Sequence, residues 1–309
     1  MKPILLLTAL FLPIAVQDSD SEVGVDAMAT SAKVNDWLIN QARVERFVNQ
    51  KLGGRVVNND VMRRLRSEAL SHLVRRQVIM EYLKTTRYYP RGGSAIERRI
   101  DQLQKRLKQV DRSLQQHLNE NGMSRVELDN EIAWKIAWQG FLDDWLSEER
   151  LDQYFQQRHR EFDGTRMKVA HLLLRPAGEE RPDDVKVRAD SIREQINLGH
   201  VTWSGAVSDF SVAQTSIEQD GLVGWIEFAA PMPVEFNRAA FQLDPGQISS
   251  PVTTSVGIHL IKCLEIEPGS RGRKDIEPVI RAAATRSIFD QLSDQKRQDV
   301  DIQYDPPGR

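Results

Sequence analysis

The sequence predicts an α+β fold, in which a small sheet with surrounding helices occupies the second half of the chain and helical segments precede and follow it. The 309 residues are enough for two compact domains. Apolar residues at helical spacing fill the first half, whereas short apolar runs separated by turn residues begin near residue 167. A helical pattern returns after residue 275.

The composition is that of an ordinary soluble globular protein, with 40% hydrophobic and 28% charged residues. A net charge of -2 does not favour nucleic acid as a partner, because proteins that bind it carry a clustered basic face. The single cysteine, Cys263, excludes an internal disulfide. The six histidines show no metal-ligand spacing, and no phosphate-binding glycine loop or nucleophilic serine turn occurs, so no metal or cofactor is expected.

Residues 1–17 have the three parts of a secretory signal, namely a positive Lys2, an apolar run over 4–16 and a polar exit at Gln17. The apolar run is shorter than the roughly 20 residues of a membrane-spanning helix. An uncleaved membrane anchor is the alternative, and contact with a membrane is expected only in that case. Residues 18–31 are small, acidic and aperiodic, which predicts a flexible leader before a helical domain over 32–165.

Helices in this first domain are expected after Asp60, from Ser94, after Ser124 and after Ser147. Ser124 and Glu127 form a predicted capping box, in which each side chain satisfies the other residue's backbone N–H. The helix after this box carries an apolar arc that includes three tryptophans, Trp134, Trp138 and Trp145. Packing between helices explains such an arc, and an exposed groove for unfolded chains is the functional alternative.

The apolar runs after residue 166 predict the order β-α-loop-β-α-β-β, which is an α+β unit of about 100 residues. The expected elements are a strand over 169–174, a helix over 182–198, a polar loop over 210–221, a strand over 223–226, a helix over 233–241 and a final strand over 258–266. This unit is assigned residues 166–268. A last helix over about 276–295 and an apolar segment at 300–302 belong to a C-terminal segment over 269–309.

Five fragments of the second unit share their order and spacing with one known family. They are His-Leu-Leu-Leu at 171–174, Gly-Leu-Val-Gly-Trp at 221–225, the series Met232, Phe236 and Phe241, Gly-Gln-Ile-Ser-Ser-Pro-Val at 246–252, and Thr-Ser-Val-Gly-Ile-His-Leu-Ile-Lys at 254–262. Together they resemble the parvulin-type (rotamase) peptidyl-prolyl cis/trans isomerases over about a third of the chain. The resemblance implies a small antiparallel parvulin sheet.

The remaining two-thirds resemble, more loosely, the helical parts of SurA- and PrsA-type folding factors. In these proteins, helices before and after the isomerase domain form one chaperone module. The resemblance therefore implies an all-α chaperone-like domain built from the N- and C-terminal segments, with Val34-Asn35-Asp36 as its opening strand and the C-terminal helix and strand packed against it.

The resemblance also implies the roles of the site residues. Met232 and Phe236 line a pocket for the proline ring, with Val223 and Phe241 beside them. His171 and His259 correspond to the paired core histidines, and Thr254 corresponds to the hydroxyl that joins their network. Two residues four apart on a helix share a face, so Met232 and Phe236 can meet one ring. A histidine on an apolar strand is more often only a core residue, and here both lie in matching motifs.

One loop departs from the family pattern, which reads Ser-x-Cys or Ser-x-Asp and places a thiol or carboxylate beside the substrate carbonyl. Aligned at Ser208, this sequence has Phe210 at that position, and the adjacent Asp209 is the expected substitute if the loop shifts by one residue. Cys263 does not match the family cysteine. Basic and acidic residues are mixed in the loop over 175–188, so phosphate-specific recognition is not expected.

The predicted function is peptidyl-prolyl cis/trans isomerisation and folding of exported proteins, with unfolded or proline-containing polypeptides as partners. An isomerase needs no cofactor, because it has only to hold the proline while the carbonyl turns about a bond with a barrier of roughly 18–20 kcal/mol. The alternative is a holdase chaperone whose parvulin domain binds chains with weak or no turnover. The expected location is the periplasm or cell envelope.

Overall fold

The computed structural model describes residues 30–305, and the predicted signal sequence and most of the predicted leader lie outside this range. The chain divides into two compact units. The first comprises the chain up to Trp145 and again from Thr285, and the second spans Leu146–Ala284. The domain boundaries expected at 165/166 and 268/269 stay a prediction. No helix within residues 30–305 is long and apolar enough to span a bilayer.

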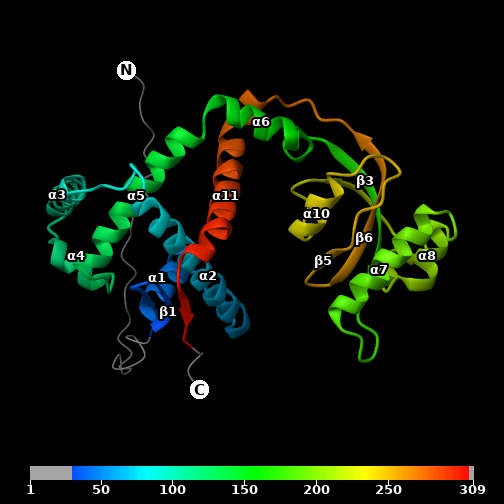
Figure 1. Cartoon of the computed structure of the whole chain (residues 1–309), viewed down its shortest axis with the longest axis horizontal. Helices are drawn as coiled ribbons and strands as arrows, with labels where there is room; N and C mark the ends of the chain where they lie inside the picture. The colour runs from blue at the N-terminus through cyan, green and yellow to red at the C-terminus, as the bar shows by residue number, and fades with distance from the viewer. Residues whose placement is uncertain (1–29, 306–309) are drawn as a thin grey trace. The chain divides into compact units, whose positions relative to one another are not determined.

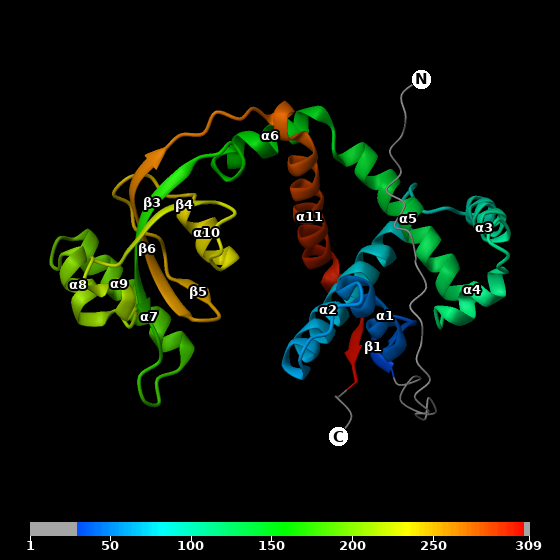
Figure 2. The same ribbon diagram turned by 180° about the vertical axis from the view of Figure 1, so that it is seen from behind.

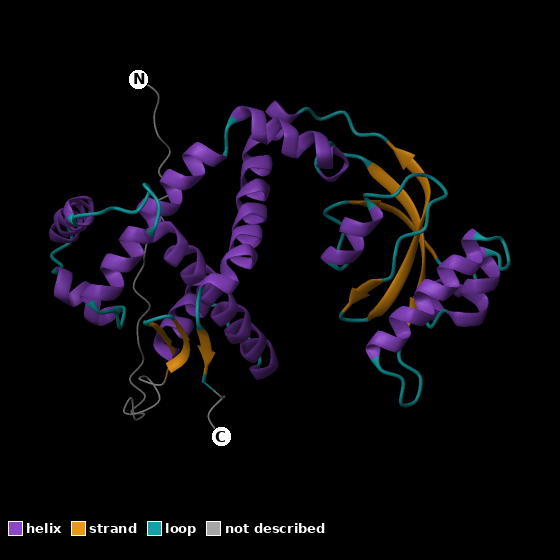
Figure 3. Ribbon diagram, in the orientation of Figure 1, coloured by secondary structure: helices purple, strands orange, loops and turns teal. Residues whose placement is uncertain are grey.

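Within residues 30–305 the first unit is mainly helical and also holds three short strands (Figure 3). Its elements are β1 (Thr30–Val34), β2 (Trp37–Asn40), α1 (Gln41–Leu52), α2 (Asn59–Lys84), α3 (Ser94–Lys108), α4 (Leu114–Glu120), α5 (Arg125–Trp145), the later part of α11 (Glu277–Lys296), a 3-10 turn (Arg297–Asp299) and β7 (Ile302–Tyr304). The domain is therefore not all-α, because the expected opening strand and C-terminal strand join β2 in a small sheet. The strand β2 was not expected, since four residues are too few for an alternating pattern to be recognised.

The sheet of the first unit joins the two ends of the described chain. Its order is β2-β1-β7, and both pairings of β1 are antiparallel. Asn35 has a φ of 50° and forms the hairpin turn with Asp36, so the strand expected at 34–36 ends at Val34. The backbone N–H of Asn35 donates to the carbonyl of Asp301 at 2.8 Å, and its side-chain oxygen accepts from the Asp301 N–H at 3.0 Å.

Helix caps in this unit follow the sequence closely. The predicted capping box is confirmed, since the Glu127 N–H donates to the Ser124 hydroxyl at 3.1 Å and the Ser124 N–H donates to the Glu127 carboxylate at 2.7 Å. The cap of α2 is Asn58, whose side chain accepts from the Val61 N–H at 2.9 Å, two residues before the expected Asp60.

The second unit is built on a four-stranded antiparallel sheet of order β4-β3-β6-β5, which confirms the predicted fold class (Figures 1 and 2). Its elements are α6 (Glu148–Arg158), a 3-10 turn (His159–Glu161), β3 (Arg166–Leu174), α7 (Pro182–Asn197), α8 (Trp203–Phe210), α9 (Gln214–Ile217), β4 (Leu222–Glu227), α10 (Val234–Ala240), β5 (Val252–Thr254), β6 (Gly257–Glu267), a 3-10 turn (Arg273–Ile276) and the start of α11. The expected polar loop over 210–221 instead holds α9, and α8 precedes it.

Each face of this sheet has its own apolar core, because side chains alternate along β3 and β6. Leu172 and Leu260 point to α7 and α8, where they pack with Val185, Ala189 and Trp203. Val169 and Ile261 point to the opposite face, where they pack with Phe236, Ala240 and Phe241 around α10. Figures 1 and 2 show α7 and α8 on one side of the sheet and α10 on the other. His171 and His259 belong to the α10 face by the same alternation.

Candidate functional site

Two histidines meet on the α10 face of the second unit. His171 lies on β3 and His259 on β6, and Leu173 pairs with His259 across the sheet, so the two histidines are diagonal neighbours. Their Nδ1 atoms lie 3.1 Å apart, and their rings stack with centroids 5.3 Å apart at 19°. One Nδ1 must carry a hydrogen and the other a lone pair, so this contact requires at least one neutral ring.

Two hydroxyl groups extend the histidine pair at its ends. The Thr254 Oγ1 lies 2.9 Å from Nε2 of His259 and also 3.2 Å from the Gly257 carbonyl. The Ser216 Oγ lies 3.4 Å from Nε2 of His171 and 3.2 Å from the Ala213 carbonyl. Each hydroxyl can either donate to its histidine or accept from it while donating to the carbonyl. The four groups thus form one hydrogen-bonded chain that is satisfied with its protons running in either direction.

Burial keeps both imidazoles neutral. Burial lowers the pKa of His171, and burial, followed by the positive charge of His171 and of Arg175, lowers the pKa of His259 to about 4. His259 is 2% exposed, so water does not solvate its imidazolium form. At neutral pH the pair is therefore a hydrogen-bonded polar group without net charge.

An aromatic residue closes one side of the pair. The ring of Phe236 meets His171 edge-on at 5.9 Å and His259 edge-on at 5.4 Å. Phe236 is fully buried, and the half-buried Met232 and Val223 pack against the same cluster. Phe241 is 3% exposed and packs edge-on against Phe228 at 5.4 Å, deeper in that core. The structure thus brings together seven of the eight site residues expected from the sequence.

The eighth residue, Asp209, lies apart from this network. It is exposed on the last turn of α8, and within residues 30–305 no hydrogen bond joins it to the histidines. Phe210 beside it is 37% exposed. The serine that points inward is Ser211, which is 9% exposed and whose hydroxyl accepts from the Leu173 N–H at 3.2 Å.

Counting the family's Ser-x-Cys or Ser-x-Asp pattern from the buried Ser211 places Ala213 at the position of the thiol or carboxylate. Ala213 is half-buried, and its carbonyl accepts from the hydroxyl of Ser216, the residue that contacts His171. Sequence reasoning missed Ser216, because no motif marks it and its segment was expected to be a polar loop rather than α9. Ser208 and Ser211 both fit the first position of the family pattern. Only the burial of Ser211 distinguishes them.

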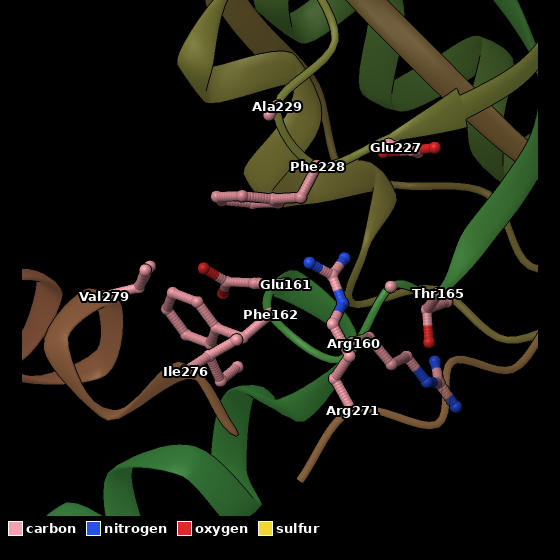
Figure 4. A pocket seen from close by; sticks show the side chains of 11 residues that line it. Arg160, Glu161, Phe162, Thr165, Glu227, Phe228, Ala229, Arg271, Ile276 and Val279 are labelled. Carbon is pink, nitrogen blue, oxygen red and sulfur yellow. The ribbon is translucent and has the colours of Figure 1, made fainter. Parts of the chain in front are cut away.

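A separate cavity of about 230 Å³ lies in the same unit, and Figure 4 shows its walls. None of the eight expected site residues lines it. The rings of Phe162 and Phe228 face it with their centroids 6.4 Å apart. Of its charged lining residues, Glu161 is paired with Arg158, and Arg160 donates to the Leu243 carbonyl and to Asp244 at 2.9 Å. The cavity lies apart from the histidine pair and is not taken as the candidate active site.

Comparison with known proteins agrees with the motifs. Residues 171–265 match the family model of the PPIC-type peptidyl-prolyl isomerase (rotamase) domain. The chain carries a parvulin-type domain. The predicted resemblance is thereby confirmed for the part of the chain that holds the histidine pair, Phe236 and Thr254.

Curated relatives include two kinds of folding factor. Over 101 residues the chain is 33% identical to chaperone SurA of Shigella dysenteriae, covering 33% of this chain and 23% of that protein. Over 138 residues it is 32% identical to foldase protein PrsA 3 of Bacillus cereus, covering 44% of this chain and 38% of that protein. The alignments thus span less than two-fifths of either relative. Among solved structures, PrsA of Bacillus anthracis matches at a TM-score of 0.37 with 17% identity, covering 74% of this chain and 96% of that one.

Proposed function

We propose that this protein is an exported folding factor that catalyses cis/trans isomerisation of Xaa-Pro bonds in unfolded polypeptides. The observation that carries the proposal is the contact of the neutral His171–His259 pair with the ring of Phe236 inside a parvulin-type domain. The signal-like start of the sequence supports export. The names of the relatives, a chaperone and a foldase, support unfolded chains as partners.

The proposed site works by holding the proline ring while the preceding carbonyl rotates. In this proposal the half-buried Met232 and Val223 contact the proline ring, and the fully buried Phe236 belongs to the cluster on which they pack. An apolar surrounding favours the twisted amide, because the twisted form has lost the charge separation of the planar resonance form. The hydrogen-bonded series Ser216, His171, His259 and Thr254 supplies polar groups beside the rotating amide. Its hydrogen bonds can all reverse direction, and this reversal changes the orientation of the dipoles without creating a charge.

The test of this proposal is the exchange rate of a proline peptide. The mature chain is expected to accelerate cis/trans exchange, and Met232→Ala is expected to lower kcat/KM about tenfold, because roughly 1.4 kcal/mol of apolar contact with the proline is lost. Val234→Ala is the matched control, since Val234 begins α10 two residues after Met232 and is 54% exposed. Met232 itself lies in the bend before α10, outside the helix that the sequence suggested it shares with Phe236. A wild-type rate equal to that in buffer, or equal effects of the two variants, would contradict the proposal.

Two further variants decide which residue occupies the polar catalytic position. Ala213→Asp places a carboxylate next to the Ser216–His171 contact and is expected to raise kcat/KM. Phe210→Asp places it on the exposed end of α8 beside Asp209 and is expected to have no effect. If Phe210→Asp raised kcat/KM and Ala213→Asp did not, the family pattern would start at Ser208 and Asp209 would regain its expected role.

A second candidate function, holding unfolded chains without turnover, is favoured by a cavity in the first unit. It has a volume of about 720 Å³ and is lined by residues of α2, α5 and α11. Trp134 and Trp138 stack at 5.3 Å and 12°, and both meet Phe289 edge-on. The apolar arc of α5 has two parts, because Ala133, Ala137 and Phe141 are buried in the core while Trp134 and Trp138 line the cavity. The second part supports the proposal of a binding site for unfolded chains.

The proposed occupant of this cavity is an apolar side chain of an unfolded polypeptide. Ser71 is exposed and lines the cavity, so Ser71→Trp fills it without removing a core residue. This variant is expected to weaken suppression of client aggregation about fivefold, the effect of losing roughly 1 kcal/mol of contact. Ser191→Trp, on an exposed position of α7, is the control and should leave suppression unchanged. If the wild type, Ser71→Trp and Ser191→Trp suppressed client aggregation equally, the cavity would not be the binding site for unfolded chains.

A further inference from the structure

The loop that carries Met232 is held against α10 by the side chain of Asn237. The loop runs from Phe228 to Pro233, between β4 and α10. The Asn237 amide nitrogen donates to the Phe228 carbonyl and to the Ala230 carbonyl, both at 3.0 Å. Only the nitrogen of an amide group can donate, so these two bonds fix the orientation of the side chain. One side chain of α10 thus binds two peptide groups of the loop.

The backbone of Met232 is bound to one of these two peptide groups. Its N–H donates to the Ala230 carbonyl at 2.7 Å, which closes a three-residue turn around Pro231. Proline suits the centre of such a turn, because its ring fixes φ at about −65°. A carbonyl oxygen has two lone pairs, and that of Ala230 accepts from Asn237 and from Met232 together. The position of the Met232 backbone therefore depends on the bond from Asn237.

Asn237 itself is too deeply buried to touch a substrate. It is 2% exposed and follows Phe236 on α10. Its Oδ1 is buried and has no hydrogen-bond partner within residues 30–305. A buried acceptor without a donor costs free energy, so the amide stabilises the fold through its nitrogen alone. Any influence of Asn237 on the proposed site must therefore pass through the loop.

We propose that Asn237 is a positioning residue, which fixes the Met232 wall of the proline pocket and thereby sets the size of ring that the pocket accepts. The inference rests on the proposed isomerase function, in which Met232 contacts the proline ring. A wall that is ordered before the substrate arrives loses less conformational entropy on binding. Because it is bound to α10, this wall also resists moving outward for a larger ring. The pocket should therefore distinguish proline from pipecolic acid, whose ring has one more methylene.

The first test is the ring-size preference of the full mature chain, measured as the Kd from NMR titration of backbone amides. The peptides are Ala-Ala-Pro-Phe and the same peptide with pipecolic acid in place of proline. The wild-type protein is expected to bind the proline peptide about tenfold more tightly, the lower end of the effect of one methylene in an apolar pocket.

The variants ask whether this preference depends on the amide donors. Asn237→Ala removes both donors, and Asn237→Asp replaces the amide nitrogen with an oxygen that has no hydrogen to donate at neutral pH. Both variants are expected to narrow the preference to about two- to threefold. Arg238→Gly is the matched control, because Arg238 is the next residue of α10 and is exposed. Glycine weakens the helix there without removing a bond to the loop, so the preference should stay intact.

The second test is a double-mutant cycle between Asn237 and Met232. Asn237→Ala alone is expected to raise KM about three- to fivefold and to leave kcat unchanged, because the proline ring is held in the ground state and in the transition state alike. In the Met232→Ala background the same substitution should have no further effect on KM, since the side chain that it positions is missing. A purely structural role would instead lower the folded fraction in both backgrounds and leave KM unchanged.

Hydrogen exchange in the peptide-free wild type replaces the variants if they do not fold. The Met232 N–H and the Asn237 side-chain amide are expected to be protected, as groups bonded in an ordered wall. Rapid exchange of either group would show that the wall is not ordered before the substrate binds, which overturns the inference.

The outcomes separate this inference from the function on which it rests. A preference in Kd that narrows in both Asn237 variants, but not in Arg238→Gly, supports the inference even if no peptide is turned over, and the proposed catalysis then fails alone. Equal Kd values for the two peptides in the wild type, or a preference that is unchanged in the Asn237 variants, overturn the inference while turnover stands. Absence of binding for both peptides overturns both.

Discussion

Gly221→Ala is expected to lower the free energy of unfolding of the parvulin-type unit by about 2–4 kcal/mol, because the added carbon has no space. A Cβ at this position would lie 2.1 Å from the carbonyl oxygen of His171, and the backbone has a φ of 76°, which side-chain-bearing residues rarely adopt. The His171 N–H donates to the Gly221 carbonyl at 2.8 Å. Any shift that relieves the clash must therefore move the backbone of the histidine itself.

The matched control is Gly224→Ala on β4, the strand that begins directly after Gly221. Gly224 also has a positive φ, 99°, but a Cβ there would meet no atom within 4 Å. Only the conformational cost of roughly 1–2 kcal/mol is expected for this variant. Thermal unfolding and hydrogen exchange of the β3 amides measure the difference. Equal losses in the two variants would show that the contact with His171 contributes nothing beyond backbone strain.

The role of Gly221 illustrates what the sequence could reveal. The glycine was found by its motif, and so were His171, Phe236, Thr254 and His259, because each stands at a fixed distance from recognisable neighbours. The helix α7 and the strands β3, β4 and β6 follow from apolar periodicity and turn residues, within a few residues of the observed bounds.

What the sequence could not reveal depends on pairing between distant residues. The contact between the two Nδ1 atoms follows from the register that sets Leu173 opposite His259, and no local pattern encodes that register. The sheet formed by β1 and β7 joins segments more than 260 residues apart through a strand of only three residues. The choice between Ser208 and Ser211 rests on which hydroxyl reaches Leu173, a contact made only in the folded chain.

The histidine pair should make the folded state sensitive to acid. A histidine that is neutral when folded and protonates freely when unfolded contributes stability above its unfolded pKa and loses it as pH falls toward the folded pKa. For His259 the window runs from about 6.5, the usual value, to about 4. Within it the unfolded chain binds more protons than the folded chain, so the free energy of unfolding must decrease as the solution becomes more acidic. His171 adds to this trend, because burial lowers its pKa as well.

The expected loss from His259 between pH 7.5 and pH 5.0 is about 2 kcal/mol, from the shift to about 4. Urea unfolding at the two pH values measures it, with His259→Gln as the comparison. Glutamine cannot titrate, so the variant should lose about 2 kcal/mol less than the wild type over the same interval, although it is less stable at pH 7.5. NMR titration of the His259 ring should show no protonation above about pH 5. Equal pH dependence of the two proteins would mean that His259 has the same pKa in the folded and unfolded chain, which would contradict the view that burial keeps the pair neutral.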